Sequence, residues 1–237
     1  MFFEALGYRP ESKVLLMMSI SRRSIAFSIL LATAGFRAFP AEAADAADAE
    51  VHRLQTSWDA IKFGVPEGDE QTKQMRALGQ DADAVAAKFP DRAEVLIWDG
   101  IITSDLASMV SAFSALGLAK RARDTLEQAY KMSPAKLDAG APTSLGVLYY
   151  RVPGFPIGFG DKAKARQLLE QATKLAPAGL DAWYFYGDFL FEQKEYSKAA
   201  DAFHHALSIP PHPDRPVWDK NRRLVIQERL DSIASKQ

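Results

Sequence analysis

The chain has 237 residues, with 29 lysines and arginines against 30 aspartates and glutamates, and it contains no cysteine. This charge balance lacks the basic excess of a nucleic-acid-binding protein. A chain without cysteine has no disulfide framework, no thiolate nucleophile and no cysteine-based metal site. With 48% hydrophobic and 25% charged residues, the composition is that of an ordinary globular protein of one or two domains.

The first 43 residues carry the three zones of a secretory signal peptide. Arg22 and Arg23 precede a mostly apolar run of 11 residues at 25–35, which is too short for the roughly 20 residues that span a bilayer. The sequence Ala-Glu-Ala at 41–43 has the small residues that signal peptidase needs. We therefore predict cleavage before Ala44 and a periplasmic or secreted bacterial protein.

Several properties of this leader stay open. Its Ser-Arg-Arg sequence at 21–23 resembles the twin-arginine export signal, so this route stands beside ordinary Sec export. Translation has three candidate start residues, Met1, Met17 and Met18. A buried helix is the alternative to a signal peptide. Without cysteine the chain lacks the attachment point of a lipoprotein anchor, and we expect no stable membrane span after signal removal.

Residues 44–90 are predicted to form an N-terminal helical pair. After a frayed lead-in at 44–50, apolar residues recur at helical spacing as far as Phe63. A second helix is expected at about 70–89, and Gly79 is expected to weaken or break it near its middle.

The next predicted pair comprises helices at about 93–107 and 119–132. The intervening segment is roughly ten residues longer than a tight helical turn needs. Its apolar residues at helical spacing predict a longer first helix; they are Met109, Val110, Phe113 and Leu116.

A third pair is predicted from helices at 143–150 and 161–175. The loop between them, 151–160, holds two prolines, three glycines and two phenylalanines. Because this composition is apolar and conformationally special, we expect the loop to pack over the fold and not to project into water.

Residues 180–213 carry the strongest pattern of the chain. Its matching positions are Trp183, Tyr186, Gly187, Leu190, Ala199, Phe203, Ala206 and Pro211. The pattern resembles a tetratricopeptide repeat (TPR), which is two antiparallel helices within a 34-residue period. Two positions depart from the usual residues, since Tyr186 replaces leucine and Leu190 replaces tyrosine. Small side chains at Gly187 and Ala199 are expected where the two helices cross closely.

The same second-helix pattern recurs at Ala122, Ala165 and Ala199, with spacings of 43 and 34 residues. One repeat cannot bury its apolar faces alone, so at least about three must stack. The predicted fold is therefore an all-α, TPR-type superhelix of about three repeats, with a final helix at 217–235 as a charged cap with one wet face. An irregular helical bundle is the alternative. The predicted divisions are 1–43, 44–90, 91–213 and 214–237.

A second resemblance rests on the sequence around the long loop. Tyr149–Gly154, followed by the loop and by Gly160–Ala165, is similar to the T-component proteins associated with TRAP transporters, which are secreted TPR proteins. The similarity covers roughly residues 90–210. It implies a periplasmic helical protein that passes or presents a small carboxylate-bearing ligand to a solute-binding subunit. The lipid-attachment cysteine of some members is missing here.

Candidate binding residues lie on the groove-facing side of the first helix of each repeat. They are Tyr150, Arg151, Tyr184, Asp188, Phe191 and Glu192. The three aromatic residues are expected to line the groove, and Arg151 to anchor an anion through its planar guanidinium. The alternative is that the aromatic residues pack against the neighbouring repeat or the long loop.

No catalytic, metal or cofactor site is expected. His204 and His205 point about 100° apart on a helix and so do not chelate one ion together. The glycines of the long loop lack the Gly-Lys-Ser/Thr sequence of a phosphate-binding loop. The sequence predicts a non-enzymatic periplasmic TPR protein that binds a protein or peptide partner in its groove. A TRAP-associated accessory protein that carries a small organic acid is the second hypothesis, and an enzyme the third.

Overall fold

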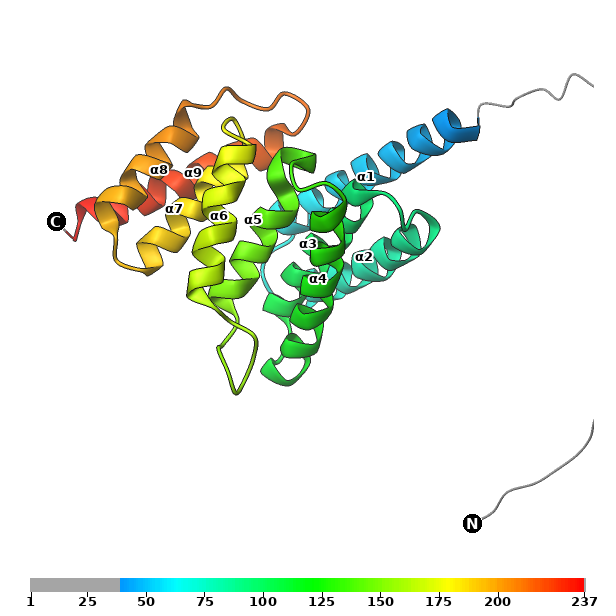
Figure 1. Ribbon diagram of the computed structural model, residues 1–237, viewed down its shortest axis with the longest axis horizontal. Helices are drawn as coiled ribbons and strands as arrows, with labels where there is room; N and C mark the ends of the chain where they lie inside the picture. The colour runs from blue at the N-terminus through cyan, green and yellow to red at the C-terminus, as the bar shows by residue number, and fades with distance from the viewer. Residues whose placement is uncertain (1–38, 237) are drawn as a thin grey trace, which may run out of the picture. The chain divides into compact units, whose positions relative to one another are not determined.

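The computed structural model describes residues 39–236 (Figure 1). The basic and apolar zones of the predicted signal peptide, and its candidate start residues, lie outside this part. The described helices are α1 (Phe39–Gly64), α2 (Asp69–Lys88), α3 (Ala93–Met109), α4 (Ala112–Met132), α5 (Lys136–Arg151), α6 (Lys162–Leu175), α7 (Leu180–Glu192), α8 (Tyr196–Ser208) and α9 (Pro216–Ala234). Residues 39–236 contain no β-strand, which confirms the all-α prediction.

Stacked helical hairpins make up the described part of the chain. Helices α3 and α4, α5 and α6, and α7 and α8 pack as pairs, and α1, α3, α5 and α7 lie side by side in that order. Figure 1 shows α9 lying against α7 and α8, and the beginning of α9 also contacts α1. The layer of first helices therefore closes on itself through α9.

Close helix crossings recur once per repeat. Each crossing sets a glycine of the first helix against a large side chain of the second: Gly100 with Leu126, Gly146 with Leu169, and Gly187 with Phe203. A Cβ atom on Gly187 would lie 2.6 Å from Cε1 of Phe203, closer than packed atoms approach. Ala199 is fully buried at the same crossing. The repeat register predicted from the sequence is confirmed.

The N-terminal pair is more regular than the sequence predicts. Helix α1 begins at Phe39, so the segment 44–50, expected to fray, is helical, and Ala47 is already buried. Helix α2 continues through Gly79, the expected weak point. This glycine is buried beside the side chain of Leu106 from α3, so packing offsets its low helix propensity.

The junction of α3 and α4 also differs from the prediction. The apolar residues after α3 do not lengthen it; α3 ends at Met109 and a new helix starts at Ala112. Ser111 occupies the N-cap position without a side-chain capping hydrogen bond, and its carbonyl accepts hydrogen bonds from two amides of the new first turn. The second helix of this repeat is thus the long one, and Phe113 is exposed on its first turn.

Helix α5 starts with an irregular turn. Residues 137–139 have φ between 51° and 58°, a left-handed conformation that side chains with a Cβ rarely adopt. The regular helix begins after them, with Pro142 in its first turn, where proline is tolerated. The predicted helix at 143–150 is therefore the regular part of α5.

The long loop after α5 follows the prediction only at its base. There Phe159 packs edge-on against Tyr149, with ring centroids 5.5 Å apart. At its tip, however, Phe155 is 94% exposed and Ile157 is 69% exposed. The expectation that the whole loop packs over the fold is wrong, because the tip projects beyond the helices that hold its base.

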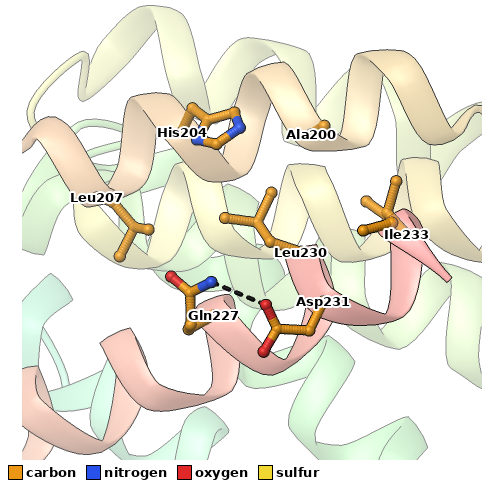
Figure 2. Close-up of a pocket in the computed structure, with 8 residues that line it drawn as sticks. Ala200, His204, Leu207, Gln227, Leu230, Asp231 and Ile233 are labelled. Atoms are coloured by element: carbon orange, nitrogen blue, oxygen red, sulfur yellow. Dashed lines mark hydrogen bonds between the residues drawn. The ribbon is translucent and has the colours of Figure 1, made fainter.

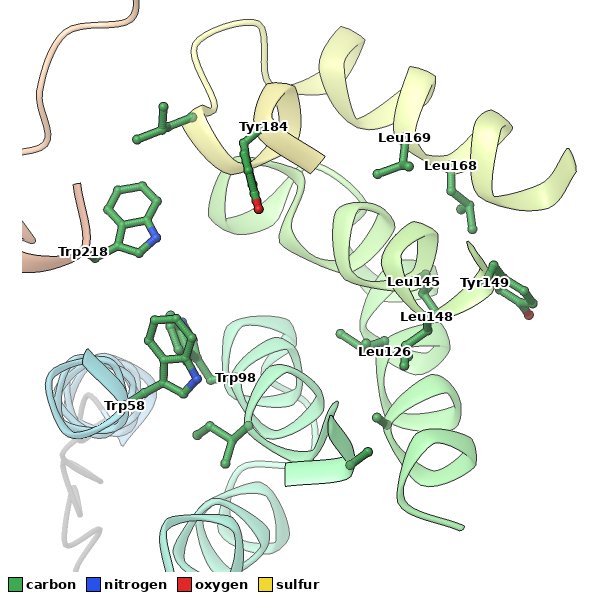
Figure 3. Packing of buried hydrophobic residues seen from close by; sticks show 14 of the residues in the cluster. Trp58, Trp98, Leu126, Leu145, Leu148, Tyr149, Leu168, Leu169, Tyr184 and Trp218 are labelled. Atoms are coloured by element: carbon green, nitrogen blue, oxygen red, sulfur yellow. The ribbon is translucent and has the colours of Figure 1, made fainter. Parts of the chain in front are cut away.

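Three tryptophans mark the place where the first-helix layer closes. Trp58 from α1, Trp98 from α3 and Trp218 from α9 lie in the same cluster of buried residues (Figure 3). The guanidinium of Arg215 lies 5.1 Å from the Trp98 ring and 4.7 Å from the Trp218 ring. Arg215 also donates two hydrogen bonds to Asp59 of α1, of 2.5 and 3.2 Å. Residues 156 positions apart are thereby joined.

We predict that Gly187→Ala lowers the free energy of unfolding by about 1–3 kcal/mol, because the added methyl overlaps the Phe203 ring. Gly117, in the interior of α4, has open space around its Cα and is the matched control. Gly117→Ala should stabilise the protein by about 0.5–1 kcal/mol, since it removes only backbone freedom. Urea unfolding of both variants measures the difference, and equal effects would contradict the close crossing.

A buried carboxylate in α3 makes stability depend on pH. Burial raises the pKa of Asp99 from an ordinary 3.8 to about 6, the charge of Asp83 adds to the shift, and Arg121 opposes it. The folded chain therefore holds this proton to higher pH than the unfolded chain. The contribution of Asp99 to stability is intact below pH 3.8 and is lost as the pH rises to about 6.

We accordingly predict that Asp99→Asn, which cannot ionise, stabilises the fold at pH 7 by about 1–2 kcal/mol. The gain should shrink towards zero as the pH falls to about 4, where the native carboxyl is protonated as well. Thermal unfolding of the wild type and the variant across this range is the measurement. A gain that is independent of pH would show that the effect is not ionisation of Asp99.

Candidate partner-binding site

Asp188 is the centre of a cluster of polar side chains between α5, α7 and α9. The residue is completely buried, and its Oδ2 atom accepts hydrogen bonds of 2.5 Å from the Tyr150 hydroxyl and from Arg151 Nη2. Its Oδ1 atom lies 2.9 Å from Arg229 Nη2, an ion pair without hydrogen-bond geometry. We call Tyr150, Arg151, Asp188 and Arg229 the Asp188 cluster.

A helix end helps to place one of these charges. Arg151 is the last residue of α5, whereas Arg229 lies in α9 before its last turn. Cationic side chains are favoured at the C-terminal ends of helices, where carbonyl dipoles leave partial negative charge. Burial and the charge of Asp188 raise the pKa of Tyr150 well above its ordinary value, so the phenol remains a hydrogen-bond donor.

Two residues of α7, seven positions apart, pair with two arginines of α9 at the same spacing. Asp181 accepts a 2.6 Å hydrogen bond from Arg222 Nε, and Asp188 pairs with Arg229. Because 181 faces 222 and 188 faces 229, the two helices run in the same direction in matched register. The Arg222 guanidinium also lies 4.2 Å from the Tyr184 ring centroid.

The final helix has an exposed polar face that includes Lys220, Glu228 and Asp231, but several of its arginines do not belong to that face. Arg222 and Arg229 of α9 face α7, and Arg215, which directly precedes α9, faces α1. Two apolar residues, Val217 and Leu224, are instead about half exposed. Salt bridges to buried or half-buried carboxylates explain why these arginines face inwards, since those carboxylates require cationic partners once they are removed from water.

The structure brings together four of the six predicted binding residues. Tyr150, Arg151 and Asp188 are directly hydrogen-bonded, and Phe191 joins them because the Arg229 guanidinium lies 4.9 Å from its ring. Tyr184 is buried beneath Arg222 and does not line an open groove.

Glu192, the sixth predicted residue, is exposed at the end of α7. It makes no hydrogen bond or ion pair with another residue of the described part. Sequence reasoning missed Arg222 and Arg229, which complete the arrangement. Their spacing of seven, which repeats that of Asp181 and Asp188, was the signal that would have found them.

The Asp188 cluster has more positive than negative charge. Two guanidinium groups share one carboxylate, and the Arg151 side chain is still 50% exposed. An arginine has five N–H donors, so donors remain after the bond to Asp188. Such a group can bind a carboxylate of another molecule through two parallel hydrogen bonds.

Two shallow hollows of about 360 Å³ each lie elsewhere. One runs between α8 and α9 and is lined by His204, Leu207, Leu230 and their neighbours (Figure 2). The other lies between α7 and α8, where the Trp183 ring packs 3.9 Å from the His205 ring. Neither hollow is under the long loop, where a carrier would be expected to enclose its ligand.

Comparison with known proteins agrees with this architecture. Residues 157–216 match the family described as tetratricopeptide repeat. A thermophilic TPR protein of Thermus thermophilus aligns with a TM-score of 0.53 and 16% identity, covering 81% of this chain and 94% of its own. The fold is a TPR-type superhelix. No curated protein matches the sequence.

Two further crystal structures align less closely with this chain. MamA has a TM-score of 0.43 and 20% identity over 70% of this chain and 91% of its own. Yeast Tom70 has a TM-score of 0.42 and 16% identity over 83% of this chain and 44% of its own. Within residues 39–236, none of the helices combines the length and the apolar character that crossing a membrane requires.

We predict strong non-additivity between the two arginines of the Asp188 cluster. Arg151→Ala or Arg229→Ala alone leaves Asp188 with one cationic partner and should cost about 1 kcal/mol. Removing both leaves a buried charge unpaired and should cost about 3–5 kcal/mol in total. Chemical unfolding of the three variants measures the coupling. Simple additivity would contradict a shared role in neutralising Asp188.

Proposed function

We propose that this protein is a non-enzymatic, periplasmic TPR protein that binds a protein or peptide partner at the Asp188 cluster. The observation that carries the proposal is the half-exposed Arg151, which shares one buried carboxylate with Arg229. The site thus has surplus positive charge and unused hydrogen-bond donors. It suits a carboxylate from an acidic side chain or from the end of a polypeptide.

The surroundings favour a polypeptide ligand. The TPR fold itself suggests protein–protein interaction. Phe191 lies beside Arg229, and arginine is one of the residues enriched among those that dominate binding energy in protein interfaces. Glu192 is exposed one turn after Asp188 and can select against a partner with a second acidic group at that place.

Helix α9 limits where the partner can lie. It covers the Asp181 and Tyr184 side of α7, a face that the sequence predicts to line the groove. A partner therefore reaches the edge at which α5 and α7 end, and a long extended peptide does not follow the whole inner layer. We expect a short acidic segment, such as a chain end or a loop, to be the part that is recognised.

Location in the periplasm is the second part of the proposal. It is supported by the basic, apolar and small-residue zones of the first 43 residues. Either the Sec or the twin-arginine route would deliver the chain there. Cleavage before Ala44 is expected, and mass spectrometry of the exported protein tests it directly.

A TRAP-associated accessory protein is the alternative function. The loop sequence from Tyr149 to Ala165 supports it, and a small organic acid would use the same two arginines. The two ligands differ in what they require, since tight binding of a small molecule usually needs a cavity that buries most of its surface. A polypeptide instead gains affinity from contacts around the anchor.

We predict that Arg151→Ala abolishes capture of the partner from periplasmic extract while Lys198→Ala, on α8, does not. Lys198 is an exposed cation that pairs with Glu195 and lies outside the Asp188 cluster. Mass spectrometry identifies the captured protein, and calorimetry with the purified partner should show at least about a tenfold loss of affinity. Equal capture by both variants would overturn the proposed site.

Calorimetry with a panel of small mono- and dicarboxylates separates the alternatives. Binding that depends on Arg151 and needs no second protein supports the accessory carrier. Capture of a protein without any small-acid binding supports the partner-binding function.

A further inference from the structure

The loop between α5 and α6 is braced by its own backbone. Gly160 N donates a 2.9 Å hydrogen bond to Pro153 O, and the amides of Ile157 and Gly158 each donate 3.1 Å bonds to Gly154 O. Its exit is tied by Asp161 N to Tyr149 O of α5 at 2.8 Å. The loop is a closed hairpin with an internal hydrogen-bond pattern.

Two glycines allow this closure. A Cβ atom on Gly160 would overlap Val152 O, and one on Gly158 would lie 2.5 Å from Pro153 O. The sequence therefore fixes the shape of a loop whose tip holds Phe155 and does not bury it. One exposed ring is common on protein surfaces, but an ordered loop that joins it to further exposed apolar side chains forms a patch of the kind that marks contact with another molecule.

Helix α4 adds a second apolar residue at this place. A Cβ atom on Gly158 would lie 3.4 Å from Leu116, so the first turns of α4 are next to the loop. Phe113, one turn before Leu116, is 97% exposed. Figure 1 shows the loop and the start of α4 at the same end of the helical stack. We call Phe113, Phe155 and Ile157 the apolar tip.

The two segments that carry the apolar tip are rich in basic residues. Residues 107–123 and 151–164 together contain six lysines and arginines and a single acidic residue, Asp161, although the whole chain has a net charge of −1. Four of the six pair with carboxylates of the fold: Arg121, Arg123, Arg151 and Lys164. The other two, Lys120 and Lys162, are exposed and form no ion pair within residues 39–236.

We propose that the apolar tip docks the protein on an anionic lipid surface. Phe113, Phe155 and Ile157 would enter the interface, and Lys120 and Lys162 would contact the negatively charged headgroups. Interfacial binding of this kind grows with the apolar area buried and with attraction between basic residues and anionic lipid. It is reversible, and it needs no spanning helix and no lipid anchor.

The shape of the tip favours a lipid over a protein surface. A stable protein interface buries about 1,200 Å² or more and needs a complementary surface. Three side chains on a projecting loop and a helix end offer much less area, but they can enter a soft interface without a matching pocket. A second copy of the chain, seated with its tip in a hollow of the first, is an outcome that the test must detect.

The absence of cysteine makes a site-specific test straightforward. Ile157→Cys in the exported protein, labelled with an environment-sensitive fluorophore, places a probe on the tip. Leu224→Cys, at a half-exposed apolar position of α9, is the matched control. With vesicles of phosphatidylglycerol and phosphatidylethanolamine, only the probe at position 157 should show a blue shift and increased intensity.

The proposal also predicts a loss of vesicle binding. Phe155→Ser combined with Ile157→Ser should lower the partition coefficient about tenfold or more, while Leu224→Ser leaves it unchanged. The double variant Lys120→Glu with Lys162→Glu should bind phosphatidylglycerol vesicles only as well as the wild type binds phosphatidylcholine vesicles. All proteins are purified after export, because the apolar run at 25–35 would bind vesicles in every variant alike and mask a tenfold loss.

Two results would overturn the proposal. The first is a probe at position 157 that does not respond to anionic vesicles. The second is a response that occurs without lipid and rises with protein concentration, together with a larger mass in light scattering, which would assign the tip to contact between copies. The partner-binding proposal is unaffected by either result, because Arg151→Ala is tested without lipid.

Discussion

The structure depends on ion pairs between buried or half-buried carboxylates and arginines of the last helix and its N-cap. Asp59, Asp181 and Asp188 lie on α1 and α7, and each pairs with an arginine of α9 or of its N-cap. Taking such groups out of water costs several kcal/mol per ion, and the pairs barely recover that cost. Their effect is therefore on geometry more than on stability. They match the register in which α9 lies against α7, where the seven-residue spacing of Asp181 and Asp188 meets that of Arg222 and Arg229.

The repeat architecture was predictable from the sequence because it depends on side-chain size at local spacings. Gly187 and Phe203 are 16 positions apart, and the close crossing that they form needs no information from the rest of the chain. The position of α9 was not predictable in this way, since it depends on Arg215 meeting Asp59 across 156 residues. A charged final helix resembles an ordinary cap until its partners are known.

The same distinction applies to the candidate site and to the loop. Arg151 and Asp188 were identified from the face that they share in their repeats, but Arg229 required the fold. The loop was expected to pack over the fold because its composition is apolar and conformationally special. Its glycines allow the backbone to close on itself, and Phe155 at the tip stays 94% exposed. Composition alone does not distinguish this closed hairpin from a loop that packs over the helices.

The contact between α1 and α9 has a consequence for how the protein unfolds. In an open solenoid each repeat touches only its neighbours, so the terminal repeats fray first and unfolding spreads inwards. Here Arg215 and Asp59 join the two ends of the helical stack, and neither terminal helix is a free end. Loss of either one removes packing from the other. We therefore expect this solenoid to unfold with the cooperativity of a globular domain, although its sequence is built from repeats.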